Sequence, residues 1–303
     1  MSKVIIRADG SGRIGFGHKV RSQALADMLP DAELHSWEGE KEADEEFLRI
    51  LDADPGAIAV LDNYFHTPQY MEAVRSRSRA LVCIDDMPTR HFPADALISF
   101  CPFGREEFSL PSEARFLSGF QYSLLRAPFL RPQSTRPREG IAVVLGGADP
   151  LGLTSRTIRR IHELLPEARI EAVAGAAVKL DSGLDAIPRL VVHRRLGGEE
   201  MADLFDRCSL GIFPASTVCM EALARHLPVA AGHFVDNQLR VYEEGVRSGL
   251  FLPLGDLREF GNGPGAQALA EAFRSGWRPS VPFPDFQSSR REIFALFEDL
   301  DRN

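Results

Sequence analysis

The chain is organised around residues 4–21, which read V-I-I-R-A-D-G-S-G-R-I-G-F-G-H-K-V-R. The apolar run at the start predicts a buried strand, and the helical spacing of Val20, Leu25 and Met28 predicts a helix at the end. The loop between them carries four glycines, Gly10, Gly12, Gly15 and Gly17. Glycine leaves the backbone bare, so a ligand can approach this loop closely. Strand, glycine-rich loop and helix in that order are typical of an α/β domain.

The glycine loop has more than one interpretation. Residues 10–15 match G-x-G-x-x-G, the dinucleotide fingerprint, but there the first glycine follows the strand directly and the helix opens at once. Here residues 7–9 come first, and Phe16 and Gly17 still precede the helix, so the dinucleotide interpretation is disfavoured. A purely structural loop with a surface histidine is the plainer alternative. We favour a ligand site, because His18 can exchange a proton near neutral pH at a helix start that attracts anions.

Composition limits the class of protein. A chain of 303 residues with 44% hydrophobic and 26% charged residues is long enough for two globular domains. The net charge of −8 argues against nucleic acid or an anionic membrane surface as partners, although one phosphorylated small molecule remains possible. No apolar run approaches the roughly 18 residues of a membrane-spanning helix. No secretory signal is visible at the N-terminus, so we expect a cytoplasmic protein without membrane insertion.

The cysteines point to a reducing environment. They are scattered, with no C-x-x-C pair, at Cys83, Cys101, Cys208 and Cys219. Cys83 lies in the apolar run 81–84, which is typical of a core thiol. Metal-ligand spacing is absent, so no metal site is expected.

The first half alternates apolar runs with helical patterns, which predicts a parallel sheet covered on both faces. Further strands are expected at residues 32–37, 57–62, 80–86 and 96–99, and helices at 40–51 and 68–76. Ligands of such sheets bind at the carboxyl ends of the strands. Four carboxylates are expected on that edge, those of Asp9, Asp62, Asp85 and Asp86.

Residues 127–140 carry three prolines, polar residues and a glycine, which marks a linker. The pattern then repeats. Strands are expected at residues 141–145, 168–173, 190–193, 210–213 and 228–231, and helices at 201–205, 216–226, 236–248 and 288–300, with a loop at 261–265. The fold class is therefore α/β, with two doubly wound Rossmann-like domains that face a central cleft suited to a two-part ligand.

Three clusters in the second half could bind a nucleotide. Gly146 and Gly147 lie between a strand and a helix, where backbone N–H groups suit a phosphate, while Asp149 could equally well cap that helix. Ser216 and Thr217 open another helix and could cap it or face an anion. Glu221, further along that helix, could bind a ribose diol or lie solvated on its surface. The amides of Asn237 and Gln238 could bind ligand hydroxyls or phosphate, or merely cap.

These motifs in series carry a family resemblance. D-x(5)-G-x-G-H-x-x-R at residues 9–21, L-G-G-A-D at 145–149, S-T-V-C-M-E-A-L at 216–223 and D-N-Q at 236–238 resemble the MurG-like, GT-B-fold nucleotide-sugar enzymes. More narrowly, they resemble the PseG-type UDP-2,4-diacetamido-2,4,6-trideoxy-β-L-altropyranose hydrolases of pseudaminic acid biosynthesis. Further echoes are L-D-N-Y, I-D-D and F-Q-Y-S-L-L-R at residues 61–64, 84–86 and 120–126. The resemblance runs in order from residue 3 to about 245.

The resemblance implies a hydrolase that needs no metal or cofactor and cleaves a UDP-sugar at the anomeric C–O bond with inversion. His18 matches the catalytic base that activates water. The implied substrate-binding residues are Asp9, Gly15, Gly17, Arg21, Tyr64 and Asp86. The implied nucleotide-binding residues are Gly146, Gly147, Ser216, Thr217, Glu221, Asn237 and Gln238. The chemistry agrees, because water needs a base while UDP is already a good leaving group.

The resemblance also divides the chain into domains. Residues 1–132 would form the sugar-binding, catalytic domain and 133–285 the UDP-binding domain, with a helix at 286–303 packing back on the first domain. The expected partner is a small UDP-sugar. A glycosyltransferase of the same fold and a non-catalytic nucleotide-sugar binding protein remain alternatives, and a dinucleotide dehydrogenase is the least favoured.

Overall fold

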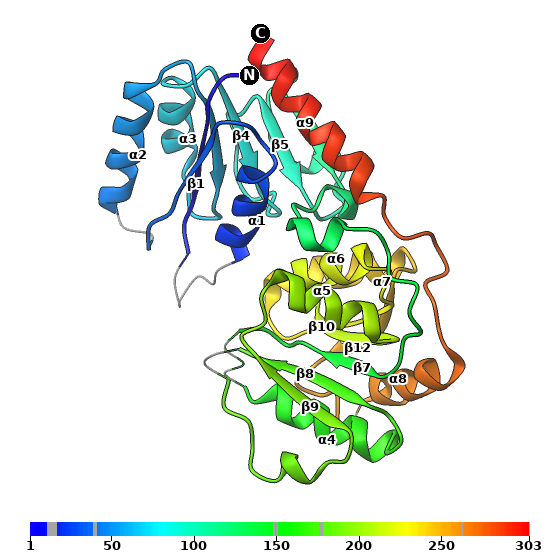
Figure 1. Ribbon diagram of the computed structural model, residues 1–303. Coiled ribbons are helices and arrows are strands. Elements are labelled where there is room, and N and C mark those ends of the chain that lie inside the picture. Colours follow the sequence, from blue (N-terminus) through cyan, green and yellow to red (C-terminus); the bar gives the residue numbers. More distant parts are fainter. Residues whose placement is uncertain are drawn as a thin grey trace. The chain divides into compact units, whose positions relative to one another are not determined.

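A computed structural model describes residues 1–10, 17–38, 41–147, 149, 151–175, 178–261 and 263–302. The chain forms two compact units (Figure 1). The first contains Met1–Arg126 and Asp285–Asn303, and the second contains Ala127–Pro284. Each unit is a parallel six-stranded sheet with helices on its faces, which confirms the predicted α/β class with two doubly wound domains.

The sheet of the first unit has the strand order β2-β1-β3-β4-β5-β6. Its strands are β1 (Val4–Ala8), β2 (Ala32–His35), β3 (Ile58–Asp62), β4 (Ala80–Ile84), β5 (Ala96–Ser99) and β6 (Arg115–Ser118). Its helices are α1 (Gly17–Ala26), α2 (Lys41–Ala53), α3 (Pro68–Arg75) and α9 (Phe286–Arg302). The chain order changes direction at β1, and β1 and β3 pair so that Ala8 stands opposite Asp62. This is the switch point where doubly wound sheets bind their ligands.

The strands of this unit are apolar along their length because both faces of the sheet are covered. Val4 and Ile6 pack into one core with residues of α1 and α9, while Ile5 packs into the other with residues of α2 and α3. On α9, Phe297 is fully buried in the first of these cores. The last helix therefore covers part of one face of the sheet of the first unit, and it lies beside β5 in Figure 1.

The sheet of the second unit has the strand order β12-β11-β10-β7-β8-β9. Its strands are β7 (Ile141–Val143), β8 (Ile170–Ala174), β9 (Leu190–Arg194), β10 (Leu210–Pro214), β11 (Val229–His233) and β12 (Phe251–Asp256). Its helices are α4 (Leu153–Leu164), α5 (Gly198–Arg207), α6 (Thr217–Ala224), α7 (Leu239–Arg247) and α8 (Pro264–Ser275).

Several elements depart from the sequence-based expectations. Strands β6 and β12 and helix α8 were not predicted, and α8 begins inside the expected loop at 261–265. Both strands lie at sheet edges, and β12 contains Pro253, which an edge strand tolerates because one side needs no ladder hydrogen bonds. The predicted helix at 236–248 is a 3₁₀ turn, Asp236–Gln238, followed by α7.

The proline-rich stretch at 127–140 is anchored to the second unit. Arg225 is fully buried and donates hydrogen bonds to the backbone oxygens of Phe129, Arg131 and Pro132, while its guanidinium also pairs with Asp206. These hydrogen bonds satisfy backbone carbonyl groups in a segment that lies outside the sheet. The units accordingly divide after Arg126, earlier than the predicted boundary after residue 132.

Candidate active site

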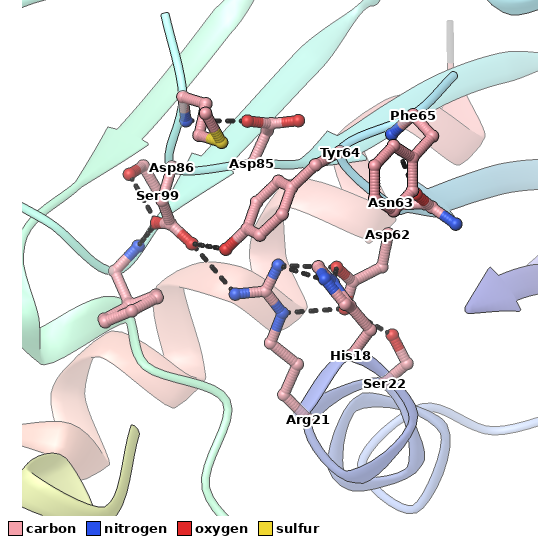
Figure 2. Close-up of polar contacts among 12 residues, drawn as sticks. His18, Arg21, Ser22, Asp62, Asn63, Tyr64, Phe65, Asp85, Asp86 and Ser99 are labelled. Carbon is pink, nitrogen blue, oxygen red and sulfur yellow. Dashed lines mark hydrogen bonds and ion pairs between the residues drawn. The ribbon is translucent and has the colours of Figure 1, made fainter. Parts of the chain in front are cut away.

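A histidine–carboxylate pair lies at the carboxyl edge of the first sheet (Figure 2). His18 stands in the first turn of α1 and is 8% exposed, and Asp62 ends β3 and is fully buried. Nδ1 of His18 lies 2.6 Å from Oδ1 of Asp62. The two residues meet because the α1 helix follows β1, and β1 and β3 are adjacent strands.

Arg21 holds this pair from one turn further along α1. Its Nε and Nη2 donate to the two oxygens of Asp62 at 2.8 and 2.5 Å, and the hydroxyl of Ser22 donates to Oδ2 at 2.8 Å. Burial by itself raises the pKa of Asp62, but the Arg21 charge and these hydrogen bonds outweigh it and lower the pKa to about 2. Asp62 is therefore a carboxylate at any physiological pH.

This geometry selects the tautomer of His18. Asp62 Oδ1 can only accept a hydrogen bond, so the proton must sit on Nδ1 of His18. Nη2 of Arg21 also lies 3.2 Å from Nδ1, but a lone pair on Nδ1 would repel the Asp62 oxygen that lies 2.6 Å away. The neutral ring then carries its lone pair on Nε2, which is the state a general base needs.

Tyr64 closes one side of the histidine. Its ring meets the His18 ring edge-on, with centroids 4.5 Å apart and planes at 77°. Its hydroxyl lies 3.4 Å from Oδ2 of Asp86, and burial raises the pKa of the phenol, so Tyr64 stays protonated and can donate a hydrogen bond. Figure 2 shows Tyr64 between the Asp86 carboxylate and the His18 ring.

Both carboxylate oxygens of Asp86 accept hydrogen bonds from other residues of the protein. Its Oδ2 accepts from Nη1 of Arg21 at 2.9 Å, and its Oδ1 accepts from the Ser99 hydroxyl at 2.8 Å and from the backbone N–H of Phe100 at 3.1 Å. The Arg21 guanidinium consequently bridges Asp62 and Asp86, two strand ends of the same sheet. These contacts suit positioning residues better than residues that bind substrate directly.

Asp9 belongs to a separate, neighbouring network. Its oxygens accept from Nε and Nη2 of the buried Arg7 at 3.3 and 2.9 Å, and from Nδ2 of Asn63 at 3.2 Å. Arg7 also donates to Tyr70 and Asp44 at 2.7 and 2.6 Å. Asp9 is 1% exposed and its carboxylate is engaged by Arg7 and Asn63, which suits a supporting residue better than one that binds substrate directly.

The structure thus brings four of the predicted residues of the first half together, namely His18, Arg21, Tyr64 and Asp86. Gly17 begins α1, and Gly15 lies outside the described residues. Asp62 was expected on the ligand-binding edge of the sheet, because it ends an apolar strand, but it was not named among the catalytic or substrate-binding residues.

The predicted nucleotide residues of the second unit lie at the carboxyl ends of its own strands. Gly146 has a φ of +106°, a conformation that favours glycine, and precedes Gly147 after β7. Asp149 accepts hydrogen bonds from the backbone N–H groups of Leu153 and Thr154, both at 2.8 Å. The Asp149 carboxylate therefore caps α4, and those two N–H groups are not open to a phosphate.

The other two clusters follow β10 and β11. Ser216 occupies the N-cap position of α6, but its hydroxyl donates to the Pro214 oxygen at 3.3 Å instead of capping the helix, whose first residue is Thr217. Glu221 lies on α6 and is only 8% exposed, so it is not the solvated surface glutamate. Asn237 is exposed, whereas the side-chain oxygen of Gln238 accepts from the backbone N–H of Phe234 at 3.0 Å.

The described residues contain neither a metal-binding cluster nor a membrane-spanning helix. Among them, no three His, Cys, Asp or Glu side chains are grouped as a metal site would require. Within the same ranges, no helix has the length and apolar character needed to span a membrane.

Comparison with solved structures places the chain in the GT-B architecture, as the motifs predicted. MurG from Acinetobacter baumannii is 13% identical, with 99% of this chain and 100% of that one covered at a TM-score of 0.59. UDP-GlcNAc 2-epimerase from Methanocaldococcus jannaschii, solved with UDP-GlcNAc and UDP, is 13% identical, with 98% and 99% covered at 0.60. The calicheamicin glycosyltransferase CalG4 is 13% identical, with 99% and 98% covered at 0.61.

A comparison of sequences identifies a hydrolase that is similar to this chain. The UDP-2,4-diacetamido-2,4,6-trideoxy-beta-L-altropyranose hydrolase of Campylobacter jejuni is 22% identical over 259 residues, which cover 78% of this chain and 93% of that protein. No family model matches the chain. The predicted resemblance to PseG-type hydrolases and MurG-like enzymes is confirmed as a resemblance at this distance.

Proposed function

We propose that this protein is a hydrolase that cleaves a UDP-linked diacetamido-trideoxy sugar at the anomeric C–O bond, with inversion, in pseudaminic acid biosynthesis. The observation that carries the proposal is the His18–Asp62 pair, with Nδ1 of the ring tied to a buried carboxylate at 2.6 Å. The name of the Campylobacter jejuni relative supplies the substrate class.

In the proposed reaction, Nε2 of His18 takes a proton from a water molecule. The water oxygen attacks the anomeric carbon, and the bond from that carbon to the UDP oxygen breaks, with its electron pair leaving on the diphosphate. Asp62 stabilises the imidazolium that forms, because it remains ionised and hydrogen-bonded to Nδ1–H. A base positioned in this way contributes about 10²–10⁴-fold to the rate. The reaction needs no metal or cofactor.

We assign UDP recognition to the second unit. Glu221 lies on α6 and is 8% exposed, and its carboxylate oxygens are the acceptors that a ribose diol requires. Gly146 and Gly147 offer backbone N–H groups without side chains, as a diphosphate requires. We also assign the remaining predicted residues, Ser216, Thr217, Asn237 and Gln238, to this nucleotide-binding role.

A glycosyltransferase is the second candidate. The same His18 base could deprotonate an acceptor hydroxyl in place of water, and two of the similar structures, MurG and CalG4, represent that possibility. The first unit places Phe65 at 69% exposure in the loop after β3, next to Tyr64, where an acceptor could find an apolar surface.

One experiment separates these candidates. The protein is incubated with UDP-2,4-diacetamido-2,4,6-trideoxy-β-L-altropyranose, without acceptor and with chelator, and the released sugar is followed by proton NMR. We expect free sugar with inverted anomeric configuration and an equal amount of UDP. A transferase would release little UDP until an acceptor is added. A binding protein would retain the intact substrate, and either outcome would overturn the hydrolase proposal.

A further inference from the structure

His66 is a buried histidine that the proposed reaction does not use. It lies in the loop between β3 and α3, four residues after Asp62, and is 6% exposed. Its Nε2 is buried and has no hydrogen-bond partner in the part of the chain that the structure describes. A buried polar atom without a partner is unfavourable, and such atoms often mark a ligand contact.

The polar side chains near the ring, Tyr70 and Arg90, are hydrogen-bonded to other groups. The nearest aromatic ring is that of Tyr70, 4.9 Å away between centroids, and its hydroxyl already accepts from Arg7. Arg90 is occupied by Asp85 at 2.5 Å and by the backbone oxygens of Asn63 and Tyr64. Tyr70 still has its own O–H to donate, and Nε of Arg90 is also buried without a hydrogen bond among the described residues, yet neither group is hydrogen-bonded to Nε2 of His66.

The ring contacts Tyr70, whose hydroxyl accepts from Arg7, the partner of Asp9, so His66 belongs to the network beside the candidate active site. The charges that act on its pKa are those of Arg7, Arg90, Asp62 and His18. Burial, reinforced by the two arginines, lowers the pKa of His66 to about 3. The imidazole is consequently neutral at physiological pH and presents one nitrogen donor and one acceptor.

We propose that His66 binds a neutral polar substituent, a hydroxyl or a carboxamide, on the sugar of the nucleotide-sugar substrate. Such a group can both donate and accept, so it satisfies Nε2 in either tautomer. This assignment rests on the proposed function, since it supposes a sugar in the first unit. His66 is then a residue for substrate specificity, distinct from the His18 base.

The test uses the full-length variants His66→Leu and His66→Gln, with His35→Leu as the matched control. His35 on β2 also has a buried Nε2 without a hydrogen bond, and its nearest charged partner is Oε2 of Glu33 at 3.6 Å. Calorimetric titration gives the affinities for UDP, for UDP-glucose and for UDP-2,4-diacetamido-2,4,6-trideoxy-β-L-altropyranose, and thermal unfolding gives Tm. Both sugars carry hydroxyls and only the second carries carboxamides, so a loss confined to the second sugar indicates a carboxamide contact and a loss for both indicates a hydroxyl contact.

We expect His66→Leu to keep the wild-type Tm or raise it, because an unpaired polar atom is removed. Its affinity for UDP should be unchanged, while that for at least one UDP-sugar should fall about 10- to 100-fold. The sugar affected identifies the substituent, and His66→Gln should recover part of the loss. His35→Leu should leave the ratio of UDP-sugar to UDP affinity unchanged.

An unchanged ratio in His66→Leu would overturn the assignment. So would a lower Tm in both variants combined with equal losses of UDP and UDP-sugar affinity, because the ring would then only support the fold. If the wild-type protein binds UDP-sugars but never hydrolyses them, the proposed function fails while the affinity ratio still tests His66. If it binds neither UDP nor UDP-sugars, both proposals fail.

Discussion

Oδ1 of Asp62 lies 2.6 Å from Nδ1 of His18, so the last residue of β3 orients a ring on the first turn of α1. The same oxygen accepts from Arg21 at 2.5 Å. One buried carboxylate therefore compensates a permanent cation and stabilises the imidazolium that would form when His18 takes a proton.

Replacing His18 by Asn should abolish the base while keeping a polar side chain at the position. We expect kcat for UDP release to fall about 10²–10⁴-fold, with KM changed far less. His91→Asn is a suitable control, because His91 is exposed and bonds only Ser109 among the described residues. Turnover of His18→Asn near the wild-type rate would contradict the role of the histidine.

Replacing Asp62 by Asn should affect both stability and activity. The Arg21 guanidinium, 6% exposed, would lose one of its two buried counterions and keep Asp86, so we expect a loss near the lower end of the roughly 3–5 kcal/mol in free energy of unfolding that breaking a buried ion pair costs. Denaturant titration measures this loss. Glu45→Gln removes the exposed pair with Arg49 and should change stability by at most about 0.5 kcal/mol. Equal effects of the two substitutions would show that the Asp62 pair is not specially stabilising.

The stability of the protein should depend on the protonation of His66. Its pKa is 6.5 in an exposed chain and about 3 in the fold, so only the unfolded state binds this proton between those values. The contribution is complete above about pH 6.5 and declines as the pH falls toward 3. Between about pH 7 and 5, wild type should lose about 2 kcal/mol more than His66→Leu in denaturant titrations. Parallel losses in the two proteins would refute this pH dependence.

Glu221 should contribute to nucleotide affinity. Glu221→Gln keeps the shape of the side chain but weakens its hydrogen bonds to a ribose diol, so we expect about a tenfold loss of UDP affinity by calorimetry. Glu243→Gln on α7, where the glutamate is exposed, should bind UDP like wild type. An unaltered affinity in Glu221→Gln would remove Glu221 from the proposed UDP site.

Asp149 should act on the fold of the second unit. Both its oxygens cap α4, so Asp149→Ala should lower the free energy of unfolding by about 1 kcal/mol. Asp149→Asn, which retains one acceptor oxygen, should lose less. A full loss of UDP affinity without any change in stability would show instead that the carboxylate serves the ligand.

Central features of the fold could be predicted because they depend on local patterns. Apolar runs such as residues 57–62 are readable from the chain, since a strand buried on both faces needs apolar residues throughout. Strands β6 and β12 escaped prediction because charged, polar, proline or glycine residues interrupt their short apolar runs, whereas β2 and β9, which also lie at sheet edges, were predicted. In the candidate site, His18 could be predicted because it follows a glycine-rich stretch at the start of a helix. Asp62 could not be distinguished from the other carboxylates at strand ends.

The sequence by itself determined that two α/β units exist and that acidic residues gather where the strands of the first unit end. Only the tertiary structure decided which carboxylate pairs with which cationic side chain. Asp62 pairs with His18 and with Nε and Nη2 of Arg21. Asp86 pairs with Nη1 of Arg21, and Asp9 pairs with Arg7. The reason is physical, because such pairings depend on side-chain directions across neighbouring strands and on burial, which the order of residues along the chain does not specify.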